Sequence, residues 1–133
     1  MKRVLLSLVC AVVLAGCGGG SSVSTPSPFR GAYVGTFQAV PATGVQVGNL
    51  TVTVGTDGKL TGLVNNTTVN IASSVSGSIS NTGQTSVTLT SPAETDTATG
   101  TVSLSAANHL LGSLTEFHNG ATVGPLNFDM TPQ

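Results

Sequence analysis

The stretch Leu50–Val64, LTVTVGTDGKLTGLV, decides the fold because it fixes how two strands pair. Apolar residues alternate on both sides of a glycine-rich turn, and a period of two is typical of a β-strand with one buried face. A two-residue turn would place the two apolar sets on opposite faces of the sheet. A three-residue loop over 56–58, with Gly58 in the left-handed region, pairs Val54 with Leu60 and keeps both sets on one face. The stretch therefore predicts an antiparallel hairpin with a three-residue loop.

The same reasoning predicts the turns and strands of the rest of the chain. Residues 81–83 and 106–108 also predict three-residue loops, since Gly and Asn tolerate positive φ. Residues 65–66 (Asn-Asn) predict a two-residue turn, and residues 119–121 predict a last loop of three residues. Eight antiparallel strands follow in sequence order, over residues 31–40, 47–55, 59–65, 67–80, 84–91, 97–105, 109–118 and 122–131.

The predicted strands form an all-β meander with no helix between them. An open meander would leave two unpaired edges, which favour aggregation, and pairing the first strand with the last removes both. Glycines recur at inward positions, where they permit strong curvature; they are Gly35, Gly62, Gly77, Gly100 and Gly112. We therefore predict that residues 29–133 form a small closed up-and-down barrel, with a curved sheet or a two-sheet sandwich as the alternative.

Composition restricts the partners of this region. After residue 28 the chain has two basic residues, Arg30 and Lys59, against five acidic ones, which gives a formal charge of −3. No cluster of basic side chains exists to contact phosphates, which argues against binding to nucleic acid. Ser, Thr, Gly and Asn are abundant and favour strands with tight turns over helices.

The first sixteen residues have the pattern of a secretory signal peptide. Met1–Arg3 is positively charged, and residues 4–14 are almost entirely apolar. The apolar run is shorter than the roughly 20 residues that a membrane-spanning helix needs. We therefore predict an N-terminal signal helix within residues 1–16 that is removed from the mature protein.

Leu14-Ala15-Gly16-Cys17 resembles the lipobox of bacterial lipoprotein precursors. The resemblance implies that the chain is cut before Cys17, and that acyl chains on this cysteine anchor it to the membrane. Gly18 in place of Asp implies, by analogy with enterobacterial lipoproteins, the outer membrane. Residues 17–28 would then be the lipidated cysteine and a Gly/Ser/Pro tether. The alternative is a buried or disulfide-bonded Cys17, whose one possible partner, Cys10, lies in the segment to be removed.

The first predicted strand is loosely similar to that of small β-barrel lipoproteins. The resemblance rests on the spacing Gly-x-Tyr-x-Gly-x-Phe over residues 31–37. It implies a barrel attached to a lipid anchor and identifies no binding residue.

Glu116 and His118 are the candidate ligand-binding residues. They stand two apart on one predicted strand and therefore share a face. If the register of that strand continues, both side chains point inward at the rim beside the last loop. The interpretation that we favour is instead a β-bulge near Pro125 that turns Phe117 inward and sends both polar side chains to solvent.

Neither a metal site nor catalysis is predicted. A metal needs three or four ligands, and His109 and Asp129 are expected at the opposite end from Glu116 and His118. Glu94 and Asp96, around Pro92, could pair as catalytic carboxylates, but the expectation is a solvated loop. The chain lacks a P-loop, a nucleophile elbow and a zinc-protease motif, and it implies no cofactor.

These observations predict a non-catalytic lipoprotein of the bacterial outer membrane, acting as a structural or protein-binding module with an unidentified envelope partner. The alternative is a lipocalin-like carrier of a small apolar ligand. The two differ in the interior that they predict. A carrier needs an internal void, which Gly35, Gly62, Gly77 and Leu104 would line. A binding module predicts a filled interior and an exposed apolar patch.

Overall fold

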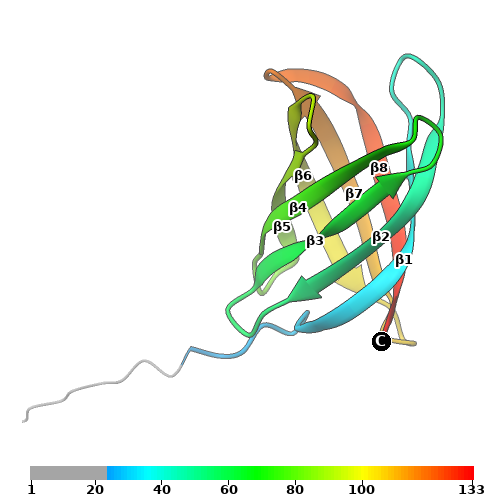
Figure 1. Cartoon of the computed structure of the whole chain (residues 1–133). Helices are drawn as coiled ribbons and strands as arrows, with labels where there is room; N and C mark the ends of the chain where they lie inside the picture. The colour runs from blue at the N-terminus through cyan, green and yellow to red at the C-terminus, as the bar shows by residue number, and fades with distance from the viewer. Residues whose placement is uncertain (1–23) are drawn as a thin grey trace, which may run out of the picture.

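Eight antiparallel strands form a closed barrel in a computed structural model of the chain, which describes residues 24–133 (Figure 1). The strands are β1 (Gly31–Ala39), β2 (Gln46–Val54), β3 (Lys59–Asn66), β4 (Ile71–Ile79), β5 (Gln84–Thr90), β6 (Thr95–Leu104), β7 (Leu110–His118) and β8 (Ala121–Pro132). The predicted signal helix and the lipidated Cys17 lie outside the described residues. Within residues 24–133, no helix is long and apolar enough to cross a bilayer.

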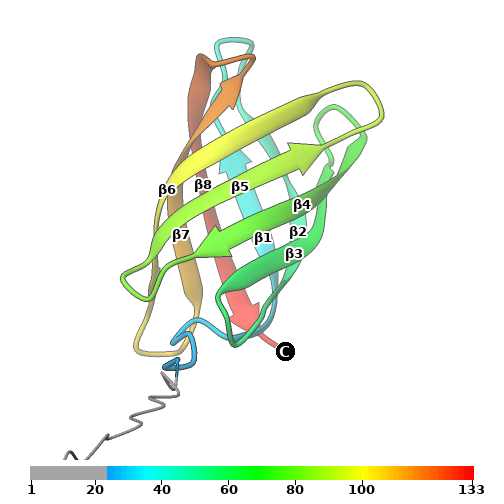
Figure 2. The ribbon, with the colours of Figure 1, turned by 90° about the vertical axis from the view of Figure 1, so that its left-hand side faces the viewer.

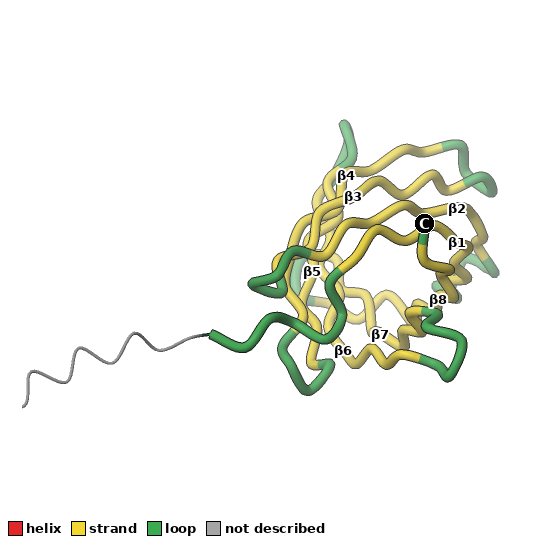
Figure 3. Tube along the Cα trace, turned by 90° about the horizontal axis from the view of Figure 1, so that it is seen from below, coloured by secondary structure: helices red, strands yellow, loops and turns green. Residues whose placement is uncertain are grey.

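Each strand pairs with its neighbours in sequence, and β1 pairs with β8 to close the ring (Figure 3). The closing register runs from Tyr33 opposite Pro132 to Ala39 opposite Leu126. Closure confirms the predicted up-and-down barrel and excludes the alternative of a curved sheet or sandwich. The barrel therefore has no unpaired edge strand.

Three loops have the predicted length and register. Val54 lies opposite Leu60, as the opening stretch predicts. The other two hairpins pair Ile79 with Thr85 and Leu104 with Leu110. The third residue of each loop has positive φ: 78° at Gly58, 86° at Gly83 and 61° at Asn108. Glycine and asparagine at these positions therefore fix the register locally.

The predicted two-residue turn over 65–66 is wrong. β3 continues to Asn66, and the loop spans 67–70. Asn66 accepts hydrogen bonds at Oδ1 from the backbone N–H groups of Thr68 and Val69, at 3.1 and 3.3 Å. This Asx-type turn moves the bend along the chain. Leu60 therefore lies opposite Gly77, not Ile71, and β4 spans Ile71–Ile79 in place of the predicted 67–80.

The last loop also differs from the prediction. Asn119 and Gly120, with φ values of 50° and 80°, form a two-residue turn, and His118 lies opposite Ala121. β8 compensates with one extra residue, Val123, between the residues that face Glu116 and Phe117. This bulge restores the predicted pairing of Leu114 with Leu126. The irregularity therefore belongs to β8, and β7 keeps its alternation.

The barrel interior is filled by side chains. The remaining apolar cavity has a volume of about 40 Å³, far below the roughly 300–1,000 Å³ of pockets for small molecules. The predicted inward glycines leave no void, because neighbouring backbone lies against them. An added Cβ would lie 2.0 Å from the Asp129 carbonyl oxygen at Gly35 and 2.2 Å from the Ser86 carbonyl oxygen at Gly77. The buried core consists of Phe29, Tyr33, Phe37, Ala39, Leu50, Val52, Val54, Leu60, Val75, Ile79, Val87, Ala98, Val102, Leu110, Leu114 and Met130.

Gly112 allows an aromatic ring to lie across the strand pair. Phe128 stands directly opposite it on β8. A Cβ at Gly112 would lie 2.0 Å from Cζ of the Phe128 ring, so the ring occupies the place that a side chain would take. An aromatic residue that covers a cross-strand glycine replaces the packing that the glycine lacks.

The N-terminal segment closes one end of the barrel, at the bottom of Figure 2. Ser27 is only 1% exposed, and its N–H donates to the Thr56 carbonyl oxygen at 2.8 Å. Phe29 is buried in the core, and its carbonyl accepts a 3.0 Å hydrogen bond from the Tyr33 hydroxyl. Packing against the barrel therefore begins within the expected tether of residues 17–28. We call this closed end, with the loops at 55–58, 80–83 and 105–109, the tether end.

Replacing Gly77 with Ala tests the close approach of β4 and β5. The new Cβ would meet the Ser86 carbonyl oxygen at 2.2 Å and the Val87 backbone, and neither can move aside as a side chain could. We expect a loss of about 1–3 kcal/mol in the free energy of unfolding, measured by denaturant titration of the full chain. Ser76→Ala, at an exposed position of the same strand, is the control and should leave stability nearly unchanged. Equal stability of the two variants would contradict the close approach.

Candidate functional site

The end of the barrel opposite the tether end is open, and we call it the mouth. The loops at 40–45, 67–70, 91–94 and 119–120 surround it, at the top of Figure 1. A pocket of about 270 Å³ enters the barrel there. Its floor is apolar, with Phe37, Val64, Leu89 and Leu126, whereas one wall carries carboxylates. The mouth is therefore the polar opening of an otherwise apolar barrel.

The pairing of β6 with β7 builds the acidic wall. Asp96 stands opposite His118, and Ala98 stands opposite Glu116. Ala98 is completely buried, so even-numbered positions of these strands face inward. Glu94 precedes β6, and its backbone is held by Ser91. Its N–H donates to the Ser91 hydroxyl at 3.1 Å, and its carbonyl accepts from the Ser91 N–H at 2.9 Å.

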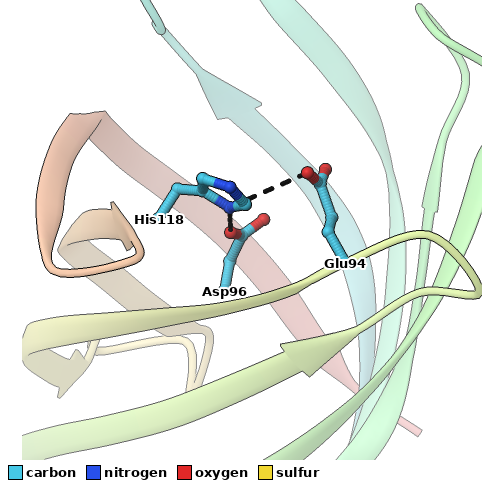
Figure 4. Close-up of side chains that lie close together, drawn as sticks. All are labelled: Glu94, Asp96 and His118. Carbon is cyan, nitrogen blue, oxygen red and sulfur yellow. Dashed lines mark hydrogen bonds and ion pairs between the residues drawn. The ribbon is translucent and has the colours of Figure 1, made fainter.

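Glu94, Asp96, Glu116 and His118 form what we call the mouth cluster. His118 Nδ1 lies 2.5 Å from Oδ1 of Asp96 and 3.7 Å from Oε2 of Glu94 (Figure 4). The other ring nitrogen, Nε2, lies 3.0 Å from Nδ2 of Asn119. Glu116 lines the same pocket as Glu94 and Asp96. One imidazole is thus held among three carboxylates.

The cluster shifts the ionisation of two of its members. The hydrogen bond with Asp96 raises the pKa of His118 above its ordinary value, and the charges of Asp96, Glu94 and Glu116 raise it further, against a smaller effect of desolvation. Burial raises the pKa of Glu116, and the charges of Asp96 and Glu94 add to this shift while His118 opposes it. Protonated His118 is therefore the form that the carboxylates favour.

The structure places Glu116 and His118 on one strand at the rim beside the last loop, as expected if the register of that strand continues. The expected bulge near Pro125 is present, with Val123 of β8 as the extra residue, but the expectation that it sends both side chains to solvent is wrong. Glu116 is half-buried in the pocket wall, and the His118 side chain is 42% exposed. The two side chains therefore keep a common face.

The expectation of a solvated loop at Glu94 and Asp96 is wrong for Asp96. Asp96 is the second residue of β6, and only 16% of its side chain is exposed. The predicted strand begins at residue 97. A strand that began one residue earlier would have included Asp96. Val102 and Ala98 face inward, so the alternation of side chains along the strand also turns Asp96 inward. The position of Asp96 was therefore predictable from the alternation along β6, and only the start of the predicted strand excluded it.

His109 and Asp129 do not join the mouth cluster, as predicted. His109 belongs to a loop at the tether end, and its Nδ1 lies 2.9 Å from Oδ1 of Asp129 on the outer surface. Both histidines thus pair with an aspartate, but His118 alone is also an ion-pair partner of a glutamate.

Charge is distributed unevenly between the two ends. Within residues 24–133, the basic side chains are Arg30 and Lys59, both at the tether end, where Lys59 Nζ lies 3.3 Å from Asp57. Three of the five acidic residues belong to the mouth cluster, where His118 is the single group that can become cationic. The excess negative charge of the barrel therefore lies at the mouth.

Comparison of the chain with protein-family models, with curated proteins and with solved structures finds no match.

The raised pKa of His118 predicts a pH-dependent stability in metal-free buffer with chelator. A histidine whose pKa is higher in the folded chain stabilises the fold below the unfolded value of 6.5, and this contribution is lost as pH rises through the folded pKa. We expect the unfolding free energy of the native chain, relative to His118→Gln, to fall over that range. Denaturant titration at each pH measures it.

Asp96→Asn is the matched control, because it removes the main cause of the shift while keeping the imidazole. The pH titration of the His118 ring by NMR should move to lower pH in this variant. A native His118 that titrates at or below 6.5 would contradict the assigned hydrogen bond.

Proposed function

We propose that the chain is an envelope lipoprotein, anchored through Cys17, whose barrel acts non-catalytically as a binding module for another envelope protein. The observation that carries the proposal is a filled barrel whose exposed apolar loops and acidic cluster gather at the end farthest from the N-terminal segment. An anchor at Cys17 would hold the tether end toward the membrane. The mouth would then face away from the membrane, where a partner can reach it.

Exposed valines on the mouth loops support a protein partner. Val40 and Val45 are the first and last residues of the β1–β2 loop, and Val69 lies in the β3–β4 loop. Val45 is 53% exposed, and Val47, at the start of β2, is exposed as well. Four of the seven exposed large apolar side chains within residues 24–133 thus lie at the mouth, and apolar side chains gathered in solvent commonly mark an interaction surface. Together with the carboxylates, they favour a partner with apolar and basic side chains.

The carrier alternative has less support. Pockets for small molecules usually measure roughly 300–1,000 Å³, whereas the deep interior of the barrel leaves about 40 Å³ and the pocket at the mouth about 270 Å³. The Phe128 ring fills the space beside Gly112, and backbone approaches Gly35 and Gly77. A ligand that reached deeper than the pocket at the mouth would have to displace the core.

The partners of His118 give no support to nucleophilic catalysis by a serine or a cysteine at this ring. Nucleophilic catalysis by Ser or Cys needs a base within hydrogen-bond reach of the hydroxyl or thiol. Among the described residues, the hydrogen-bond partners of the His118 ring are Asp96 and Asn119. Neither side chain is such a nucleophile.

Cys17→Ala tests the anchor. If Cys17 carries the acyl chains, its loss should block lipoprotein-type processing and release the barrel from the membrane fraction. Fractionation of the host envelope, with the mass of the processed chain, measures both effects. A variant that stays in the membrane fraction and is cut at the same place would overturn the anchor.

Site-specific photo-crosslinking in the host tests the binding surface. A crosslinking residue at Val45 or Val69 should join the barrel to one protein of the envelope. Leu111, an exposed apolar residue at the start of β7 near the tether end, is the matched control and should give no such product. Equal crosslinking from Leu111, or none from either valine, would contradict a partner at the mouth.

A further inference from the structure

The mouth cluster combines donors that transition metals prefer. His118 offers an imidazole nitrogen, and Glu94 and Asp96 each offer a carboxylate oxygen (Figure 4). One ligand atom from each residue lies within 4.8 Å of the other two. Mixed nitrogen and oxygen donors from three protein side chains, with a position left for water, are typical of an open zinc-type site.

We infer that the mouth cluster binds one divalent transition-metal ion through His118 Nδ1 and the carboxylates of Glu94 and Asp96. This inference deepens the proposed function, since the ion would lie in the surface that the partner contacts.

The fold holds two of the three ligands in place. Asp96 and His118 are opposite residues of paired strands, so their backbones keep a fixed separation. Metal–donor distances of about 2.0–2.2 Å place tetrahedral donors roughly 3.3–3.6 Å apart. Oδ1 of Asp96 lies 2.5 Å from Nδ1 of His118, so these two atoms have to move apart by about 1 Å when an ion replaces the proton between them. Oε2 of Glu94 lies 3.7 Å from Nδ1, and its side chain, which is 49% exposed, can make the small remaining movement. Its backbone stays fixed by Ser91 during that movement.

Charge at the mouth favours a cation. Glu94, Asp96 and Glu116 line one pocket, and neither Arg30 nor Lys59 lies near them. Glu116 is half-buried in that wall. A divalent ion would offset the repulsion among these carboxylates. Glu116 would add negative charge beside the ion without being one of its three ligands.

Asn119 can orient the imidazole for the ion. Its amide lies 3.0 Å from Nε2 of His118, on the side of the ring away from Asp96. When Nδ1 binds a metal, Nε2 carries the proton and donates it to an acceptor. Rotation of the amide presents its oxygen to Nε2, so the same residue suits both the free and the bound ring.

The donor set also indicates the kind of metal. Imidazole nitrogen suits Zn²⁺, Ni²⁺ and Cu²⁺, whereas Ca²⁺ and Mg²⁺ prefer sites made of oxygen alone. Zn²⁺ is therefore the suitable probe, and Ca²⁺ is the comparison that tests for simple attraction to carboxylates.

The test is isothermal titration of the detergent-solubilised full chain with Zn²⁺, for the native chain and for Glu94→Gln and His118→Gln. We expect one ion per chain, with binding weakened about tenfold or more in each variant, because loss of a ligand should matter at least as much as loss of an outer-shell partner. Ca²⁺ should bind far more weakly. His109→Gln removes the other histidine–aspartate pair and should leave the affinity unchanged.

The inference is overturned if Zn²⁺ does not bind, if His118→Gln binds as tightly as the native chain, or if His109→Gln weakens binding equally. Circular dichroism of each variant confirms that the barrel is intact. Crosslinking from Val45 in the presence of a chelator separates the two proposals. If a partner is captured but the chain does not bind Zn²⁺, only the metal inference is overturned. If the chain binds Zn²⁺ but no partner is captured, only the proposed binding module is overturned.

Discussion

Closure of β1 on β8 is the constraint on which the other features depend. A closed ring of paired strands must keep one set of alternate residues inside all the way round. The extra residue in the last hairpin, Val123, is accommodated on β8, so that β7 keeps its inward set. The inward set of alternate residues includes Ala98 and Leu114 in the core. Toward the mouth, the next members of this set are Asp96 and Glu116. The acidic wall is therefore the continuation of the core onto the rim.

Close packing of the strands explains why the barrel is filled. Eight strands can enclose a ligand cavity or be filled by their own side chains. Here backbone lies against Gly35 and Gly77, and the Phe128 ring covers Gly112. The interior keeps a cavity of about 40 Å³. The chemistry available to a partner is consequently at the mouth and on the loops around it.

The parts of the fold that sequence could predict are those set by local constraints. The third position of three loops requires positive φ, and Gly58, Gly83 and Asn108 tolerate it, so these loops and their registers could be predicted. The bend after Asn66 depends on a side-chain hydrogen bond, which competes with the turn that Asn-Asn suggests. The Asp96–His118 pair joins residues 22 positions apart and needs the register of β6 with β7 to be seen. Cys17 lies outside the described residues, so the anchor remains a proposal.

The C-terminus lies beside the start of β1, since Gln133 donates its N–H to the Ala32 carbonyl oxygen at 2.9 Å. This proximity has a mechanical consequence for a barrel attached at its N-terminus. Tension between an anchor and a partner at the mouth would first load the Ser27–Thr56 hydrogen bond and the buried Phe29. Beyond them it would pull β1 lengthwise against β2 and β8 at once. In a chain anchored at Cys17, as proposed, the two ladders of hydrogen bonds along β1 would share that load.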